Sequence, residues 1–165
     1  MLFDTRSKET STLKNAIITS QPISGWLWAI RDFPQVQADE LKNLAWSSYQ
    51  ELALNILWRF DFWISRDELK SVINEAYWNQ WHNKDITPVK QMWNLPLYSL
   101  HLGYGPTFAF KNVALEFLPR LLSKLTKWIV VNVLWASSWD TINAAHSWVR
   151  SEERRVGKEC RSRWS

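Results

Sequence analysis

One segment of the sequence surrounds a lysine with the features that a reactive lysine needs. It reads GYGPTFAFKN, from Gly103 to Asn112, and it joins a predicted strand to a predicted helix. Two glycines and a proline allow a tight turn that another group can approach closely. Lys111 follows Phe110 and precedes an apolar helix start, and partial removal from water is what makes a lysine amine a Schiff-base nucleophile. The alternative is an ordinary solvated lysine at a helix start.

A second polar segment follows a β-branched apolar run and opens another predicted helix. It reads ASSWDT at residues 136–141, where Ser138, Asp140 and Thr141 supply hydroxyl and carboxylate groups. Hydroxyls and free backbone N–H groups at a helix N-terminus bind carboxylate or phosphate. Simple N-capping by Ser138 or Asp140 is the commoner use of such residues, and it stays open as the alternative.

Helical periodicity dominates the sequence before the lysine segment. Residues 1–37 show little period and predict loops, short extended pieces and one helix near residues 12–19. Between residues 39 and 77 apolar residues recur at steps of three and four, with a break expected near Ser47. Two capping-box patterns mark helix starts in this stretch: Ser48 with Glu51, and Ser65 with Glu68.

Strands and helices alternate after residue 96, which predicts a parallel sheet. The expected elements are strands over 97–102 and 129–134 and helices over 112–124 and 140–149. We therefore predict an α/β fold class, with a mainly helical domain over residues 1–95 and the truncated beginning of an α/β domain over residues 96–149. An open parallel edge there is not a complete fold.

The end of the chain, residues 150–165, differs in character from the rest. It carries six Arg or Lys and three acidic residues, so it holds +3 of the net charge of +4. Its sequence resembles the translation of a common sequencing-library adapter, and we interpret it as a non-native tail. A solvated basic tail and a nucleic-acid-binding arm are the alternatives. On the adapter interpretation, neither the basic charge nor Cys160 indicates a function.

Several classes of function are not expected from the composition. No stretch approaches the length of an apolar membrane span, and the first residues lack the pattern of a signal peptide. His82, His101 and His146 do not have zinc-ligand spacing, so no metal site is expected. We predict a cytoplasmic protein with neither nucleic acid nor membrane as a partner, and the sequence leaves the oligomeric state open.

Together the two polar segments resemble those of threonine synthases. GPTFAFKN resembles the GPTLAFKD motif of that family, and WASSWDTINAAHSW resembles its GATSGDTGSAA stretch at a similar spacing. Near the start, DTRS resembles the family's STRG and ISGWLWAI resembles DGGLYVP. AYWNQWHNKDITPVKQM resembles AYSTFDHPEVTPLVKL, and the resemblance runs from about Met1 to Val149.

This resemblance implies an enzyme of the pyridoxal-phosphate fold type II class that converts O-phosphohomoserine and water to threonine and phosphate. By resemblance, Lys111 would hold the cofactor covalently and act as a base, and Asn112 would contact the cofactor. Ser138, Asp140 and Thr141 would bind the amino-acid end of the substrate. The family's loop for the cofactor phosphate comes later in its sequence, so we expect this chain to be inactive by itself.

Two departures from the family motif surround Lys111. Asn112 stands where the family has Asp, and Tyr104 stands where a His is usual, so the tuning of the lysine is left open. The alternatives are another fold type II enzyme, such as a threonine dehydratase or a threonine-synthase-like phospho-lyase, or a non-catalytic helical interaction module with Lys111 on its surface. The long helical region before the lysine favours threonine synthase.

The tryptophan content is anomalous, with thirteen Trp against four Gly. Some bacterial lineages read UGA as glycine, and translating such a gene with a table that reads UGA as tryptophan would give this pattern. Trp28 and Trp81, by contrast, stand where aromatic residues are normal. The positions where the family has glycine are Trp26, Trp135 and Trp139, with Trp128 and Trp148 interpreted in the same way.

Overall fold

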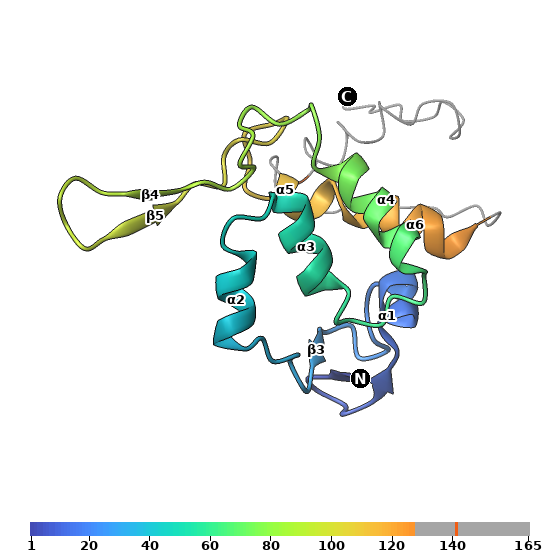
Figure 1. The fold of residues 1–165 in the computed structure, drawn as a ribbon. Coiled ribbons are helices and arrows are strands. Elements are labelled where there is room, and N and C mark those ends of the chain that lie inside the picture. The colour runs from blue at the N-terminus through green and yellow to red at the C-terminus, as the bar shows by residue number, and fades with distance from the viewer. Residues whose placement is uncertain (128–140, 142–165) are drawn as a thin grey trace, which may run out of the picture.

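The computed structural model describes residues 1–127 and Thr141. In that part of the chain, short helices accompany two small antiparallel sheets (Figure 1). In chain order the elements are β1 (Leu2–Asp4), β2 (Thr10–Ser11), α1 (Leu13–Thr19), β3 (Trp28–Ile30), α2 (Ala38–Leu44), α3 (Tyr49–Leu57), α4 (Arg66–Ala76), β4 (Val89–Gln91), β5 (Tyr98–Leu100), α5 (Asn112–Leu115) and α6 (Leu118–Thr126).

The N-terminal sheet has β1 in its middle, paired antiparallel with β2 on one side and with β3 on the other. Leu2 of β1 is buried. α1 begins after Thr12, whose side-chain oxygen accepts a hydrogen bond of 3.2 Å from the backbone N–H of Asn15. The prediction of short extended pieces and one helix near residues 12–19 is confirmed.

α2, α3 and α4 follow as separate helices, with the predicted break between α2 and α3. α3 and α4 bury apolar residues, whereas α2 buries none. Ser48 and Ser65 form the two predicted capping boxes, in which each serine hydroxyl accepts a hydrogen bond from the backbone N–H of the glutamate three residues on. That glutamate in turn accepts one from the backbone N–H of the serine. α4 buries the predicted apolar face: Leu69, Val72, Ile73 and Ala76.

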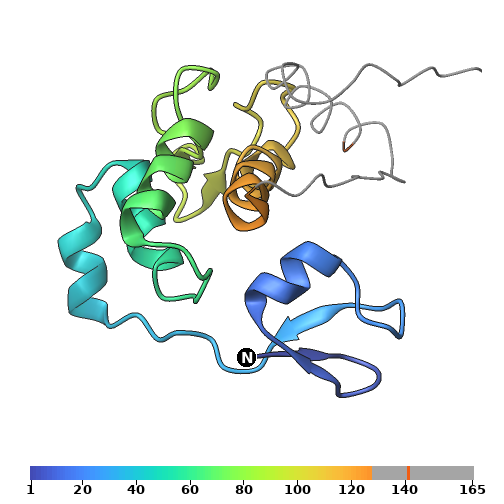
Figure 2. The ribbon, with the colours of Figure 1, turned by 90° about the vertical axis from the view of Figure 1, so that its right-hand side faces the viewer.

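α6 lies between α4 and α1 and completes the hydrophobic core (Figure 2). Leu121 of α6 belongs to the buried cluster that contains the α4 face, and Leu13 and Ile17 of α1 pack against that cluster. The prediction of one continuous helix over residues 112–124 is wrong, because the structure has two separate helices there, α5 and α6. Pro119 lies in the first turn of α6, where its missing N–H is harmless, whereas it would break a hydrogen bond inside a longer helix.

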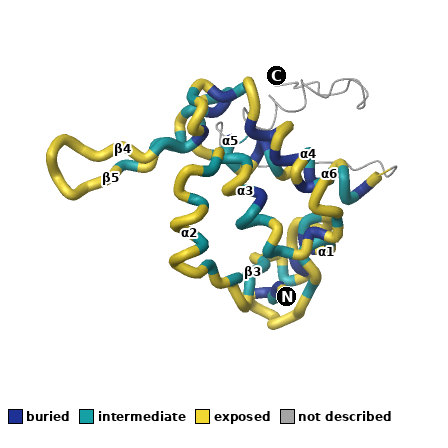
Figure 3. Tube along the Cα trace, in the orientation of Figure 1, coloured by how far each residue is buried: buried dark blue, intermediate teal, exposed yellow. Residues whose placement is uncertain are grey.

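β4 and β5 form an antiparallel hairpin that projects from the helices (Figure 1). Almost all of its residues are exposed (Figure 3). The strand predicted over residues 97–102 exists in part, as β5, but the parallel pairing predicted for it is not what the described residues show. An apolar run indicates a strand and leaves its partner undefined. The partner is β4, which a short turn brings alongside.

Several predicted features lie outside the described residues. They are the strand over 129–134, the helix over 140–149 apart from Thr141, the tail over 150–165, and Trp128, Trp135, Trp139 and Trp148. Within residues 1–127, no helix combines the length and apolar character needed to cross a membrane. The same residues contain no group of three or more His, Cys, Asp or Glu side chains arranged to hold a metal ion.

Asp4, at the end of β1, is fully buried and anchors the turn that follows it. Its carboxylate accepts hydrogen bonds from the backbone N–H groups of Arg6 at 3.0 Å and Ser7 at 3.2 Å, and from the Ser7 hydroxyl. Burial by itself would raise the pKa of this carboxyl. The hydrogen bonds outweigh that effect, because they stabilise the ionised form, and they lower the pKa to about 2.

We predict that Asp4 contributes acid sensitivity to the fold. Its pKa is lowered from 3.8 to about 2 on folding, so its contribution to stability is complete above pH 3.8 and is lost as the pH falls through 2. Urea unfolding at several pH values across that interval measures the loss. Asp4→Asn does not titrate and should show a shallower dependence on pH, whereas identical pH dependence in both proteins would contradict the prediction.

Two exposed tryptophans have a backbone conformation that favours glycine. Trp63 and Trp93 have φ angles of 58° and 51°, and they are 62% and 80% exposed. A bulky residue is strained in this left-handed region. Trp26, a position where the sequence predicts glycine, is not in that region, and the Arg6 guanidinium lies 3.9 Å from its ring centroid. Trp81, where an aromatic residue is expected, is buried.

We predict opposite effects of glycine at exposed and buried tryptophans. Trp93→Gly should raise the free energy of unfolding by about 1 kcal/mol, because it relieves backbone strain and removes a side chain with few contacts. Trp81→Gly should lower it by about 3–5 kcal/mol, because it leaves a cavity and removes the indole hydrogen bond to the Ala76 carbonyl. Chemical denaturation measures both, and a loss at Trp93 as large as that at Trp81 would show that the indole is needed there.

Candidate functional site

Lys111 is the N-cap residue of α5, and its side chain makes no capping hydrogen bond. It follows the β4–β5 hairpin in the chain. Its carbonyl accepts hydrogen bonds from the backbone N–H groups of Ala114 at 3.1 Å and Leu115 at 2.9 Å, so the first turn of the helix fixes its backbone. The side chain is half-buried, and its Nζ lies 5.7 Å from the centroid of the exposed Phe110 ring. The lysine amine therefore lies near one exposed aromatic ring.

Asn112, the next residue, is fully buried and organises the turn before the helix. Its Oδ1 accepts two hydrogen bonds from Thr107, from the backbone N–H at 3.2 Å and from the hydroxyl at 2.7 Å. Its Nδ2 is buried and has no hydrogen-bond partner among the described residues. Thr107 holds Oδ1, so the orientation of the amide is fixed. Nδ2, the donor atom, therefore lies on the side of the amide away from Thr107.

Gly105 makes this arrangement possible by close approach. A β-carbon on Gly105 would lie 2.4 Å from the Asn112 Cβ and 2.8 Å from its Oδ1, so no larger residue fits without movement. The Gly105 carbonyl accepts a hydrogen bond of 2.9 Å from the backbone N–H of Phe108, which has a φ of 57°. The segment is thus a compact turn closed by both backbone and side-chain hydrogen bonds.

Three contacts fasten this turn to the helical body. The backbone N–H of His82 donates to the Tyr104 carbonyl at 2.8 Å, and the His82 ring stacks on Phe108 with centroids 4.6 Å apart. The Tyr77 hydroxyl, at the end of α4, donates to the Val113 carbonyl at 2.8 Å. Burial raises the pKa of that hydroxyl, so it stays protonated and keeps donating.

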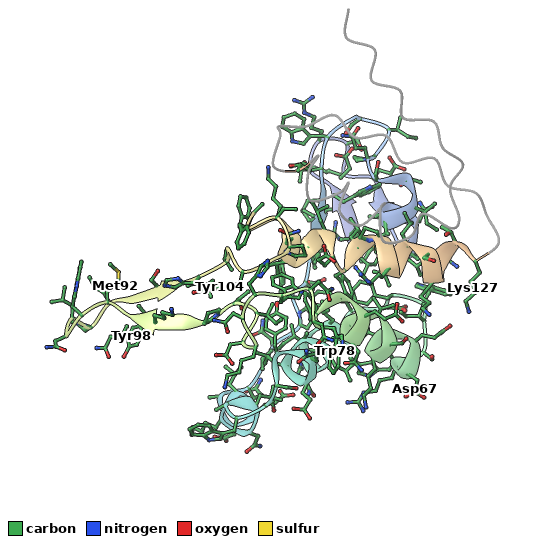
Figure 4. All side chains as sticks on the ribbon, turned by 90° about the horizontal axis from the view of Figure 1, so that it is seen from above. Asp67, Trp78, Met92, Tyr98, Tyr104 and Lys127 are labelled. Atoms are coloured by element: carbon green, nitrogen blue, oxygen red, sulfur yellow. The ribbon has the colours of Figure 1, made fainter. Side chains whose placement is uncertain are left out.

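The root of the hairpin meets the same turn at Tyr104 (Figure 4). The Lys90 ammonium donates to the Tyr104 hydroxyl at 3.4 Å, and the His101 ring stacks on the Tyr104 ring with centroids 6.3 Å apart. Tyr104, which stands where the related motif has His, is therefore a link between the hairpin and the turn.

The structure places the predicted site residues as follows. Lys111 and Asn112 lie together at the start of α5. Ser138 and Asp140 lie outside the described residues, and Thr141, which is described, is half-buried. The juxtaposition predicted between Lys111 and residues 137–141 stays a prediction.

Sequence reasoning missed the roles of Thr107, Gly105 and Tyr77 in this site. The motif pointed to the glycine, because two glycines and a proline stand together, but contacts between side chains five or more residues apart have no signature in the sequence. What the turn offers chemically is a primary amine near an aromatic ring, on Lys111, and a buried amide donor on the next residue, Asn112. That pair suits a ligand with a carbonyl carbon for the amine and a hydrogen-bond acceptor for the amide.

The chain is similar to a known protein family and to known sequences. Residues 2–77 match the family described as "Threonine synthase N terminus". A threonine synthase from Methylobacillus glycogenes is 32% identical over 139 residues, which cover 78% of this chain and 29% of that protein. The threonine synthase of Saccharomyces cerevisiae is 34% identical over 127 residues, covering 70% of this chain and 23% of that protein. The chain thus spans less than a third of the length of these relatives.

Two solved structures resemble this one. A threonine synthase from Brucella melitensis, described as bound to PLP, superposes with a TM-score of 0.69 at 27% identity, over 75% of this chain and 27% of that one. The yeast threonine synthase superposes with a TM-score of 0.67 at 31% identity, over 76% of this chain and 26% of that one. The likeness in sequence and the likeness in structure point to the same family.

We predict that Gly105→Ala destabilises the fold by about 1–3 kcal/mol, because its methyl group would overlap Asn112. Gly103→Ala is the matched control, since a β-carbon there meets only the Phe108 carbonyl oxygen at 3.3 Å. Urea unfolding followed by circular dichroism measures both. Equal stability of the two alanine variants would mean that the Gly105–Asn112 contact is not essential.

Proposed function

The chain belongs to the threonine synthase family, and on that premise we propose that it is the N-terminal part of an enzyme that makes threonine and phosphate from O-phosphohomoserine and water. The proposed cofactor is pyridoxal 5'-phosphate, which is bound in the Brucella melitensis structure. The observation that carries the proposal is the position of Lys111 at the start of α5, behind a turn closed by Asn112, Thr107 and Gly105.

Lys111 is the proposed catalytic residue. Its Nζ would hold the cofactor covalently, and the same amine would act as the base that removes the proton from the substrate Cα. When bound, the cofactor supplies an electron-withdrawing ring that stabilises negative charge on the substrate. The position of Lys111 supports this role, because the side chain is half-buried at the start of α5 with its Nζ 5.7 Å from the centroid of the Phe110 ring.

Asn112 is the proposed partner of the cofactor's phenolic oxygen. Its Oδ1 is engaged by Thr107, while its buried Nδ2 has no partner among the described residues and is available as a donor. A buried amide N–H without a partner is costly, so an acceptor supplied by a ligand would satisfy it. An aspartate at this position, as in the related motif, would present a carboxylate oxygen instead of an amide N–H. On this proposal, Asn112 would therefore contact the cofactor's phenolic oxygen differently from the aspartate.

Ser138, Asp140 and Thr141 are the proposed binding residues for the amino-acid end of the substrate. The proposal rests on their match to the family's substrate-binding stretch and on the capacity of such a segment to bind carboxylate. We propose the division into a helical domain over residues 1–95 and an α/β domain beginning at 96 on the same basis. Activity then belongs to the whole polypeptide, because the family binds the cofactor phosphate with residues beyond the matched part.

The proposal is tested on a chimaera in which residues 1–149 of this chain replace the matching part of the Methylobacillus glycogenes relative, with Trp135→Gly and Trp139→Gly. Incubation with pyridoxal phosphate, borohydride reduction and peptide mass spectrometry should locate the label on Lys111. Lys111→Ala should lose it completely, because no other residue supplies the bonded nitrogen. Lys124→Ala, on α6, is the control that keeps it. Full labelling of the Lys111→Ala chimaera would disprove the assignment.

The same assay tests the interpretation of the tryptophans. A chimaera that keeps Trp135 and Trp139 should bind neither cofactor nor substrate, because an indole on either residue fills the space that a carboxylate must enter and restricts the backbone. Circular dichroism shows that both chimaeras are folded. Equal labelling and equal substrate binding would show that the tryptophans are compatible with the site and that the glycine interpretation is wrong.

A further inference from the structure

A buried tyrosine, Tyr77, contacts the backbone next to the candidate site from the side of the helical body. It follows the last residue of α4 and is only 4% exposed. Its hydroxyl donates a hydrogen bond of 2.8 Å to the Val113 carbonyl. Val113 is the second residue of α5, which begins at Asn112 and has Lys111 as its N-cap residue. One hydrogen bond therefore joins the end of α4 to the short helix at whose start both site residues lie.

The Val113 carbonyl needs this partner because α5 is short. In a longer helix the backbone N–H of Phe117 would donate to it. That N–H donates instead to the Ala114 carbonyl at 3.2 Å. A helix of four residues is also too short to be stable without tertiary contacts. The Tyr77 hydroxyl therefore both satisfies the carbonyl and ties α5 to the helical body.

Tyr77 is itself held by its neighbours in α3 and in the loop after α4. The Gln50 side-chain amide donates a hydrogen bond to the Tyr77 carbonyl. The Tyr49 ring packs edge-on against the Tyr77 ring, with centroids 4.9 Å apart, and the Trp81 ring lies 5.8 Å away. The Trp81 indole N–H donates to the Ala76 carbonyl at 2.9 Å, which closes the end of α4. The position of the Tyr77 hydroxyl is thus set by the helical body.

The Tyr49 hydroxyl extends this arrangement. Burial raises the pKa of Tyr49, and hydrogen bonds with the side chains of Tyr77 and Thr87 oppose that effect. Each hydroxyl has one proton to donate. Because the Tyr77 proton is used at the Val113 carbonyl, Tyr49 must be the donor to the Tyr77 oxygen, and Thr87 the donor to the Tyr49 oxygen. The three hydroxyls therefore form a directed chain of hydrogen bonds that ends on α5.

We propose that Tyr77 is a positioning residue for the candidate site, which holds the first turn of α5 so that Lys111 and Asn112 keep their places. The proposal rests on the proposed function, because those are the residues assigned there to the cofactor. Thr107 and Gly105 also contact Asn112, but they belong to the same turn and move with it. Tyr77 contributes a hydrogen bond to α5 from outside that turn.

Hydrogen exchange on this chain, without cofactor, tests whether Tyr77 holds α5. Tyr77→Phe keeps the buried ring and removes only the hydroxyl. The backbone amides of Leu115 and Glu116, which donate to the Lys111 and Asn112 carbonyls, should then exchange about fivefold to tenfold faster, because the lost hydrogen bond makes local opening easier. Tyr98→Phe is the matched control, because Tyr98 is 68% exposed on the hairpin. Amides of α4 report that each variant is folded.

The absorbance of the chimaera loaded with pyridoxal phosphate tests whether this position matters to the site. Asn112→Ala should move the pH midpoint of the absorbance change of the bound cofactor, because it removes the proposed donor to the phenolic oxygen. Tyr77→Phe should move the midpoint in the same direction by at least about 0.3 pH unit. It should add nothing when Asn112→Ala is already present, because it acts through Asn112. A residue that only stabilised the fold would leave the midpoint unchanged.

Each other outcome has a defined meaning. Unchanged exchange of the Leu115 and Glu116 amides in folded Tyr77→Phe overturns the proposal, and so does an unchanged midpoint, or a shift that is equal with and without Asn112. If Tyr77→Phe does not fold, Tyr49→Phe decides, because it keeps the Tyr77 hydroxyl and removes its donor; about twofold faster exchange of the same amides is expected, and no change overturns the proposal. A chimaera that takes up no cofactor contradicts the proposed function, and the exchange of α5 then decides about Tyr77 by itself.

Discussion

The packing of α4 against α6 is the contact on which the rest of the described structure depends. Leu69, Val72 and Ile73 are fully buried, and Leu121 of α6 joins the same cluster. This contact holds together the two ends of the chain segment between the helices, which contains the β4–β5 hairpin and the lysine turn. The hydrogen bond from Tyr77 to the Val113 carbonyl closes the same segment nearer to the site. The segment between the two helices adds Tyr77, Trp81 and Ile86 to this core, whereas almost all residues of the β4–β5 hairpin are exposed.

The turn that carries Lys111 is ordered by polar contacts and close approach, with little apolar burial. Asn112 is the central residue, because it accepts from Thr107 and lies against Gly105. This arrangement has a chemical consequence. The amide oxygen holds the turn, and the buried nitrogen has no partner among the described residues. On our proposal, the structural role and the binding role of this side chain are divided between its two polar atoms.

The helical body and the β4–β5 hairpin differ in how completely they bury their apolar surface. α4 buries one full face, whereas almost all residues of the hairpin are exposed. The hydrogen bond from Tyr77 to the Val113 carbonyl comes from the body, so the start of α5 is tied to the better-packed part of the structure. On our proposals, this is the part that keeps Lys111 and Asn112 in place.

The sequence by itself determined the features that depend on neighbours along the chain. The capping boxes at Ser48 and Ser65, the buried face of α4 and the motif around Lys111 are local patterns, because hydrogen bonds over three residues and a 3.6-residue period need no distant partner. Only the tertiary structure decided that β5 pairs with β4 and that Gly105 touches Asn112. It also decided that Trp63 and Trp93 have a glycine-like backbone. Strand partners, side-chain contacts across a turn and backbone angles depend on how the whole chain packs, and a periodic pattern carries no information about them.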